Sequence, residues 1–180
     1  IKKYEDYEPV LRTQLQRTGL DYLDVLFLHG IGTSQFQLIE ETGAYVCADR
    51  YCFGSFPGRQ RIGLNDTEDA LTQVCRFYLE TNQCPRFMSE DKIIGRREYL
   101  KKLVEDYNAD GIIYEQAKFC DFWGYERMLA GKVMNDEYGI PTVGLDREYV
   151  VRGAGQLSTR IQAFVESLEI KKIQKGEGKK

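Results

Sequence analysis

The segment GIIYEQAKFCDFW, Gly111 to Trp123, decides the fold that the sequence predicts. It begins with a short apolar run typical of a strand buried on both faces, and it continues through a polar turn into a helix. Cys120 lies in that turn, at the carboxyl end of the strand and at the N-terminus of the helix. The unpaired N–H groups of a helix N-terminus stabilise a thiolate. Ligands of open α/β sheets bind at this edge, so Cys120 is the candidate centre of the chemistry.

Strands and helices alternate through the rest of the chain, with two helices between the second and third strands. The expected strands are 22–28, 44–48, 111–115 and 140–145, and the expected helices are 8–18, 35–42, 65–80, 92–108, 122–137 and 155–169. Asn65, Asp66 or Thr67 is expected to cap the third of these helices. The order predicts an α/β fold, a Rossmann/flavodoxin-like parallel sheet of about four strands in the order 2-1-3-4, covered by helices on both faces.

Residues 1–170 are expected to form one α/β domain, followed by a disordered Lys- and Gly-rich tail, 171–180. The loops that follow the strands at their carboxyl ends are 29–34, 49–58, 118–121 and 146–149. They are rich in polar, glycine or cysteine residues. Because parallel strands end at one edge of a sheet, these loops are expected to converge there.

The composition excludes several classes of partner. The chain has 180 residues with 25 Lys and Arg against 28 Asp and Glu, a net charge of −3, so no basic field favours nucleic acid or an anionic membrane surface. No apolar run has the length of a membrane span. The first residue is Ile and no signal-peptide pattern follows it, which favours a cytoplasmic protein and a fragment or processed chain with a further part upstream.

The five cysteines show no disulfide framework. They are Cys47, Cys52, Cys75, Cys84 and Cys120, an odd number at irregular spacing, which favours reduced thiols. Cys75 lies on the apolar side of a predicted helix and is expected to be buried there as a small hydrophobic residue. Cys47 is expected inside the sheet, and Cys52 in the loop that follows it.

Three interpretations of Cys120 remain open from the residues alone. The thiol can be a packed side chain, a nucleophile activated by the helix with His29 as its base, or a ligand of a metal or iron–sulfur centre. His29, the single histidine, ends the first strand beside the predicted switch point. A partly buried imidazole bonded to a backbone carbonyl is the alternative for His29.

Two further patterns have simple structural explanations. The turn Gly30-Ile31-Gly32-Thr33-Ser34 precedes a helix and can cradle a phosphate, but it lacks the spacing of known phosphate loops and is equally an ordinary tight turn. The pairs Asp49-Arg50 and Asp146-Arg147 can contact a substrate, and solvated ion pairs are the expectation that we adopt for them.

Several segments resemble the 2-hydroxyacyl-CoA dehydratase and benzoyl-CoA reductase family of iron–sulfur subunits. They are Asp110-Gly111-Ile112-Ile113, Lys118-Phe119-Cys120-Asp121, Asp146-Arg147-Glu148-Tyr149, the loop 48–55 and GQLSTRIQAFVE at 155–166. Their order and spacing are similar to those of the C-terminal half of such a subunit. The resemblance implies homologous subunits that work in pairs, each holding a [4Fe–4S] cluster through three cysteines. Cys120 falls on the third of these, while Cys47 and Cys52 do not match the first two, which are expected upstream.

The aromatic residues of 51–56 and 122–125 look most like the benzoyl-CoA reductase branch of the family. This branch implies an oxygen-sensitive oxidoreductase for anaerobic aromatic degradation, in which ferredoxin and an ATP-hydrolysing activator subunit drive reduction of the benzoyl-CoA ring. Cys120 would then ligate the cluster, His29 would donate a proton, and Gly30, Gly32 and Thr33 would line the path of the acyl-CoA thioester. The alternatives are a 2-hydroxyacyl-CoA dehydratase subunit, a non-catalytic structural or assembly domain, and a Cys–His hydrolase.

Overall fold

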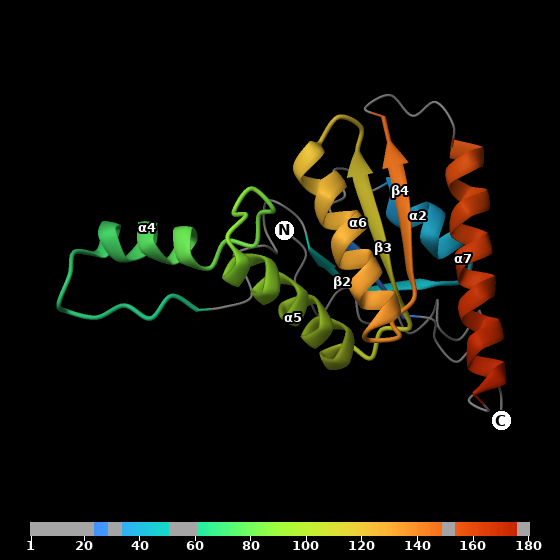
Figure 1. The fold of residues 1–180 in the computed structure, drawn as a ribbon, viewed down its shortest axis with the longest axis horizontal. Coiled ribbons are helices and arrows are strands. Elements are labelled where there is room, and N and C mark those ends of the chain that lie inside the picture. Colours follow the sequence, from blue (N-terminus) through green and yellow to red (C-terminus); the bar gives the residue numbers. More distant parts are fainter. Residues whose placement is uncertain (1–23, 29–33, 51–60, 149–153, 176–180) are drawn as a thin grey trace, which may run out of the picture.

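Four strands lie side by side in one parallel sheet, with helices on both of its faces (Figure 1). The computed structural model describes residues 24–28, 34–50, 61–148 and 154–175. The elements are β1 (Asp24–Leu28), α2 (Ser34–Glu41), β2 (Tyr45–Arg50), α4 (Ala70–Glu80), α5 (Glu90–Asp106), β3 (Gly111–Ala117), α6 (Asp121–Asp136), β4 (Thr142–Arg147) and α7 (Ala154–Gln174). The predicted α/β class with a parallel sheet is confirmed. None of the helices in the described ranges is long and apolar enough to cross a membrane.

The order of the described strands is β2-β1-β3-β4, and every neighbouring pair is parallel. The first crossover places β2 beside β1 on one side, and the chain then returns to add β3 and β4 on the other. Leu28 of β1 lies opposite Tyr114 of β3, and Ala117 of β3 lies opposite Arg147 of β4. The carboxyl ends of the strands therefore meet at one edge, as the sequence predicts for its loops.

Apolar side chains fill both faces of the sheet, which explains why its central strand reads as a continuous apolar run. On one face α2 and α7 cover the sheet, and the core there is Ile39, Ala44, Ile113, Leu145, Ile161, Phe164, Val165 and Leu168. On the other face α5 and α6 cover it, and the core is Ala48, Leu100, Leu103, Val104, Ile112, Tyr114, Ala130 and Met134. Gly111 is needed where α7 crosses β3, because a Cβ there would lie 2.8 Å from the Phe164 ring.

β2, β3, β4 and the last helix extend further toward the C-terminus than predicted. β2 runs to Arg50 and β4 to Arg147, so both Asp-Arg pairs belong to strands rather than loops. α7 continues to Gln174, so the predicted disordered tail begins too early, and residues 176–180 lie outside the described ones. Lys172 near the end of α7 pairs with Asp110 at 2.7 Å. The positive charges of Lys171 and Lys172 also interact favourably with the negative end of the helix dipole.

One helix stands apart from the sheet. α4 and the segment before it project away from the other elements, and we call residues 61–80 the α4 arm (Figure 1). The cap of α4 is Asp69, whose carboxylate accepts a hydrogen bond from Thr72 N at 3.0 Å, and not one of residues 65–67 as predicted. Cys75 is exposed, so the prediction of a buried thiol is wrong. The sequence predicts that the apolar side of α4 packs on the core. In the structure Leu71, Cys75 and Leu79 on that side are exposed instead.

Candidate functional site

Cys120 lies at the N-cap position of α6, in the turn that leaves the carboxyl end of β3. Its N–H donates to the Ala117 carbonyl at 3.1 Å, and its carbonyl accepts the Gly124 N–H at 3.0 Å. The thiol forms no capping hydrogen bond, and the residue is half-buried. The backbone of Cys120 is therefore fixed by the strand end and the helix start, while its sulfur stays available at the positive end of α6.

The turn before Cys120 carries local backbone strain. Phe119 has a φ of +69°, in the left-handed region that bulky residues avoid, and its side chain is 96% exposed. No packing of the aromatic ring offsets this strain. Lys118 N donates to the Arg147 carbonyl at 2.8 Å, and the Lys118 ammonium pairs with Glu148. The turn after β3 is thus joined to the end of β4, which agrees with the predicted convergence of these two loops.

Gln116 supports the Cys120 turn from the α6 side of the sheet. Its Nε2 donates to the Cys120 carbonyl at 3.1 Å. Gly124 leaves room for this contact, because a Cβ there would lie 3.0 Å from that nitrogen. The amide oxygen of Gln116 is buried and has no hydrogen-bond partner within the described part of the chain. Sequence reasoning missed Gln116, although a polar residue near the end of an apolar strand is a usable signal.

A buried carboxyl group lies on the opposite face of β3. Glu115 is 2% exposed, and its Oε1 lies 2.8 Å from Arg147 Nε, although neither carboxylate oxygen accepts a well-oriented hydrogen bond from a described residue. Burial raises the pKa of Glu115 to about 7, and Arg147 opposes that rise. Asp146 pairs instead with Arg127 of α6 at 2.7 Å. The expectation that Asp146-Arg147 form a solvated pair is therefore wrong, because the two side chains point to opposite faces of the sheet.

Arg50, at the end of β2, is 1% exposed and is also not part of a solvated pair. Its Nη2 donates to the Gln83 carbonyl at 2.9 Å, and its guanidinium lies over the Trp123 ring, 5.6 Å from the centroid. Burial lowers the pKa of Arg50, and the negative charge of Glu126 opposes this shift. A buried arginine thus joins the end of β2 to the first turn of α6, directly after Cys120.

Glu126 and Arg96 form a buried ion pair beside this arginine. Arg96 Nε and Nη2 donate to the two Glu126 oxygens at 3.1 and 3.0 Å, and Arg96 Nη1 donates to the Phe87 carbonyl at 2.6 Å. These contacts hold the 81–89 connection against α6. Sequence reasoning missed them, although Glu126 follows Trp123 and precedes Ala130 at helical spacing on the buried side of α6.

The family of the chain follows from comparison with known proteins. Residues 26–168 match the family model of the 2-hydroxyglutaryl-CoA dehydratase D-component. The chain belongs to this dehydratase family. One relative, from Escherichia coli strain K12, is named as a dehydratase subunit, YjiM, and is 27% identical over 139 residues, which are 77% of this chain and 35% of that protein. Another is the (R)-phenyllactyl-CoA dehydratase beta subunit of Clostridium sporogenes, 36% identical over 104 residues, or 57% of this chain and 27% of that one.

The chain spans about a third of the length of these dehydratase relatives. The family match confirms the predicted resemblance at the level of the dehydratase family. Cys120 lies within the matched range, as do His29, Gly30, Gly32 and Thr33. These last four residues and Cys52 lie outside the described ones, so the pairing of Cys120 with His29 stays a prediction.

The described thiols of this dehydratase-family chain do not gather in one place. Cys47 packs against the core on the α5 and α6 face, Cys75 is exposed on the α4 arm, and Cys84 lies in the 81–89 connection. Over the described ranges no three His, Cys, Asp or Glu side chains are close enough to hold a metal ion together. Among the described residues, the turn that follows β3 therefore offers one thiol, that of Cys120.

Proposed function

We propose that the chain is part of a 2-hydroxyacyl-CoA dehydratase subunit, which converts a 2-hydroxyacyl-CoA into a 2-enoyl-CoA and water. The match to the dehydratase family over residues 26–168 carries this proposal. Both relatives are named as dehydratase subunits, and one of these names specifies an acyl-CoA thioester. This supports the dehydratase alternative over reduction of benzoyl-CoA, which rests on aromatic residues alone.

Cys120 is the residue that we propose as a ligand of a [4Fe–4S] cluster. The position fits a cluster ligand, because the thiol is free of capping bonds and the N–H groups of α6 favour negative charge beside it. Gln116 and Gly124 hold the backbone of Cys120 and so fix where its sulfur can reach. When bound, such a cluster supplies an iron that polarises the thioester carbonyl. The remaining ligands would come from residues outside the described ranges.

The further parts of the machinery are proposals of the same kind. Dehydration involves no net oxidation or reduction, so an electron injected to start it is recovered at the end of each turnover. An ATP-hydrolysing activator fed by ferredoxin would supply that electron, and a homologous iron–sulfur subunit would complete the enzyme. His29 is proposed as the proton donor, and Gly30, Gly32 and Thr33 as lining for the acyl-CoA path.

The test is iron, sulfide and EPR analysis of the full-length protein, purified without oxygen together with its partner subunit. Wild type, Cys120→Ser and Cys75→Ser are compared, because Cys75 is an exposed thiol on α4, the helix that projects away from the sheet and from α6 (Figure 1). We expect a cluster signal that weakens or changes in Cys120→Ser alone. Dehydration of a 2-hydroxyacyl-CoA is then assayed beside reduction of benzoyl-CoA.

Each result has a defined meaning. Dehydration that is lost with Cys120→Ser supports the proposal. Reduction of benzoyl-CoA without dehydration would overturn it and restore the reductase assignment. A complex without iron, or with a cluster indifferent to Cys120→Ser, would remove Cys120 from the chemistry and favour a structural or assembly domain.

A further inference from the structure

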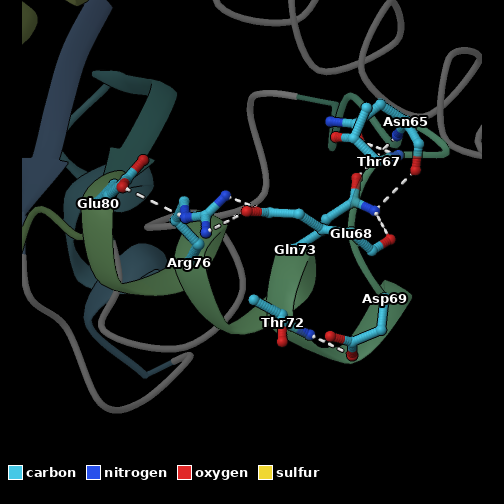
Figure 2. A network of polar contacts seen from close by, with 8 residues as sticks. All are labelled: Asn65, Thr67, Glu68, Asp69, Thr72, Gln73, Arg76 and Glu80. Carbon is cyan, nitrogen blue, oxygen red and sulfur yellow. Dashed lines mark hydrogen bonds and ion pairs between the residues drawn. The ribbon is translucent and has the colours of Figure 1, made fainter.

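Two glutamates are buried among the described residues, and they use their oxygens in opposite ways. Glu126 is 6% exposed, and each of its carboxylate oxygens accepts a hydrogen bond from Arg96, at 3.1 and 3.0 Å. Glu115 is 2% exposed, and neither of its oxygens has a hydrogen-bond partner in the described part of the chain. Even the partly exposed Glu68 of the α4 arm bonds through both oxygens to Arg76 (Figure 2). Buried carboxylates are normally satisfied, so the two open acceptors of Glu115 call for a ligand or a reaction.

Glu115 lies close to the edge where the sheet opens between β1 and β3. The helices that follow these two neighbouring strands cover opposite faces, with Ile39 of α2 in one core and Ala130 of α6 in the other. In open α/β sheets the ligand crevice forms outside the carboxyl ends of such a strand pair. Glu115 is two residues before Ala117, the last residue of β3, and therefore roughly 7 Å from the strand end. The fold thus places this carboxyl group next to its ligand-binding edge.

The surroundings of Glu115 are apolar except for one arginine. Its side chain points to the same face as that of Ile113, which packs there with apolar residues of α2 and α7. The charged group that contacts it is Arg147 of β4, whose Nε lies 2.8 Å from Oε1, whereas Arg160 of α7 donates to the Gly144 carbonyl instead. Burial raises the pKa of Glu115 to about 7, and Arg147 limits the rise. Such a carboxyl group can accept and release a proton at neutral pH.

The Glu115–Arg147 pair and the Cys120 turn are held by the same strand end. Ala117 lies opposite Arg147 in the ladder, and the Arg147 carbonyl accepts the Lys118 N–H at 2.8 Å. The Ala117 carbonyl accepts the Cys120 N–H at 3.1 Å. A few backbone contacts therefore fix the position of Glu115 relative to the turn that carries the proposed cluster ligand.

We propose that Glu115 is the base that removes the C3 proton of the 2-hydroxyacyl-CoA during dehydration. This inference rests on the proposed function, because it assigns one step of that reaction. A base needs a carboxylate oxygen that no protein donor occupies, and Glu115 keeps both of its oxygens open. Arg147 orients the carboxylate and favours its charged form. A purely structural ion pair is the alternative, and Glu126 shows that such a pair in this chain uses both oxygens.

The step balances in protons and electrons. Once the thioester holds the electron that the activator supplies, its C2–O bond breaks, and the hydroxyl leaves as water with the proton assigned to His29. The unpaired electron left at C2 makes the neighbouring C3–H bond acidic, and that proton passes to the Glu115 carboxylate. The electron pair of the C3–H bond forms the C2–C3 double bond, and the extra electron is given back. Glu115 releases its proton before the next turnover, so the products are 2-enoyl-CoA and water.

The test compares wild type, Glu115→Gln and Glu126→Gln in the full-length protein, purified without oxygen together with its partner subunit. The substrate is the 2-hydroxyacyl-CoA that wild type dehydrates, prepared with hydrogen or with deuterium at C3. We expect Glu115→Gln to lower kcat about 100-fold or more with little change in KM, and to raise the deuterium isotope effect on kcat, because removal of the C3 proton becomes limiting. Glu126→Gln is the matched control, because it removes the other buried glutamate, on the α6 side of the sheet, and should keep the wild-type isotope effect.

The pH profile adds a measurement that a structural role would not move. Wild-type kcat/KM is expected to fall below about pH 7, as the base becomes protonated. Glu126→Gln should keep this limb and Glu115→Gln should lose it. The wild-type profile also decides the question if Glu115→Gln does not assemble, because a kcat/KM that stays constant between about pH 5.5 and 8 would overturn the proposal.

The outcomes separate this inference from the proposed function. If wild type dehydrates its substrate and Glu115→Gln does so at the same rate with the same isotope effect, Glu115 is not the base, and the proposed function stands. If the complex dehydrates no 2-hydroxyacyl-CoA and reduces benzoyl-CoA, the proposed function fails and this inference fails with it. Iron content and EPR signal equal to those of wild type in Glu115→Gln show that its loss of activity does not come from loss of the cluster.

Discussion

The body of the molecule and the α4 arm each contain an Arg–Glu ion pair, and the two pairs differ in their exposure to water. Arg96 and Glu126 meet through two hydrogen bonds with side chains 2% and 6% exposed. Arg76 and Glu68 meet through two hydrogen bonds with side chains 46% and 35% exposed. Geometry is therefore not what distinguishes the two pairs. Burial decides what each contributes, because water screens the arm pair and is excluded from the body pair.

The two regions also differ in where they place leucine. Leu100 of α5 is fully buried against the sheet, whereas Leu79 of α4 is 62% exposed. The body is stabilised by its own apolar contacts, and the arm is shaped by polar ones with its apolar side left outward. The same residue type therefore contributes to the core in the body and stays exposed to solvent on α4 in the structure.

The largest expected effect separates the two ion pairs. Glu126→Leu leaves Arg96 without its buried counter-charge and removes the negative charge that favours the cation of Arg50. We expect it to lower the free energy of unfolding by about 3–5 kcal/mol. Glu68→Leu should have a far smaller effect, because its pair is solvated. Urea unfolding of both variants measures this, and equal losses would show that burial does not distinguish the pairs.

The two leucines give the next comparison. Leu100→Ala leaves a cavity under the sheet and is expected to cost about 2–5 kcal/mol. Leu79→Ala should change the stability of the unassociated protein by less than about 0.5 kcal/mol, as exposed substitutions do. Unfolding midpoints report both values. A large loss with Leu79→Ala would mean that the arm is packed against its own chain after all.

Glu115 gives the body a pH dependence opposite in sign to that of the arm, where hydrogen bonds from Arg76 and Thr72 lower the pKa of Glu68 and of Asp69. The pKa of Glu115 is about 7 in the folded protein against 4.5 ordinarily, so the folded state holds this proton more tightly. The resulting stability is fully present below about pH 4.5 and is lost as pH rises through about 7, a contribution of about 3.5 kcal/mol at about 1.4 kcal/mol per pKa unit. Unfolding at pH 4.5 and 7.5 should show this loss in wild type, and a smaller one in Glu115→Gln. The same slope in both proteins would assign it to other groups.

The smallest expected effect concerns the turn before Cys120. Phe119→Gly replaces a residue at a φ of +69° by one that adopts this conformation without steric cost, and the exposed ring loses no packing. We expect a change between zero and about 1 kcal/mol in favour of the folded state, and Phe119→Ala, which keeps its Cβ, should not gain. Thermal unfolding of the two variants compares them. Clear destabilisation by glycine would show that the ring is held by contacts in the assembled protein.

Several features of the fold follow from local sequence signals. The apolar run 111–115 predicts a buried strand, and the turn that follows it places Cys120 at the start of a helix, which the structure has at α6. The predicted helix 122–137 matches α6 closely, and Gly139, a residue type that favours helix ends, takes a φ of +68° just beyond it. Such signals succeed because period, caps and glycine conformation depend on a few neighbouring residues.

The sequence did not predict which charged residues are buried inside the body. Arg50, Arg96, Glu115 and Glu126 are all buried, whereas charged residues are expected at the surface. Each of these charges is tolerated because its partner, although distant in the sequence, lies next to it in the fold. Glu126 is 30 residues from Arg96, and Glu115 on β3 pairs with Arg147 on the neighbouring strand β4. A local pattern carries no information on such pairs.

The sequence by itself determined a parallel α/β fold and a thiol at the strand-to-helix turn, because hydrophobic period and chain order restrict the topology to few choices. Only the tertiary structure decided which charges are buried and which apolar side is exposed. Cys75 shows the reason most directly. The sequence gives its helix an apolar side, but the direction in which that side points depends on the hydrogen bonds that Gln73 and Arg76 make with the segment before the helix.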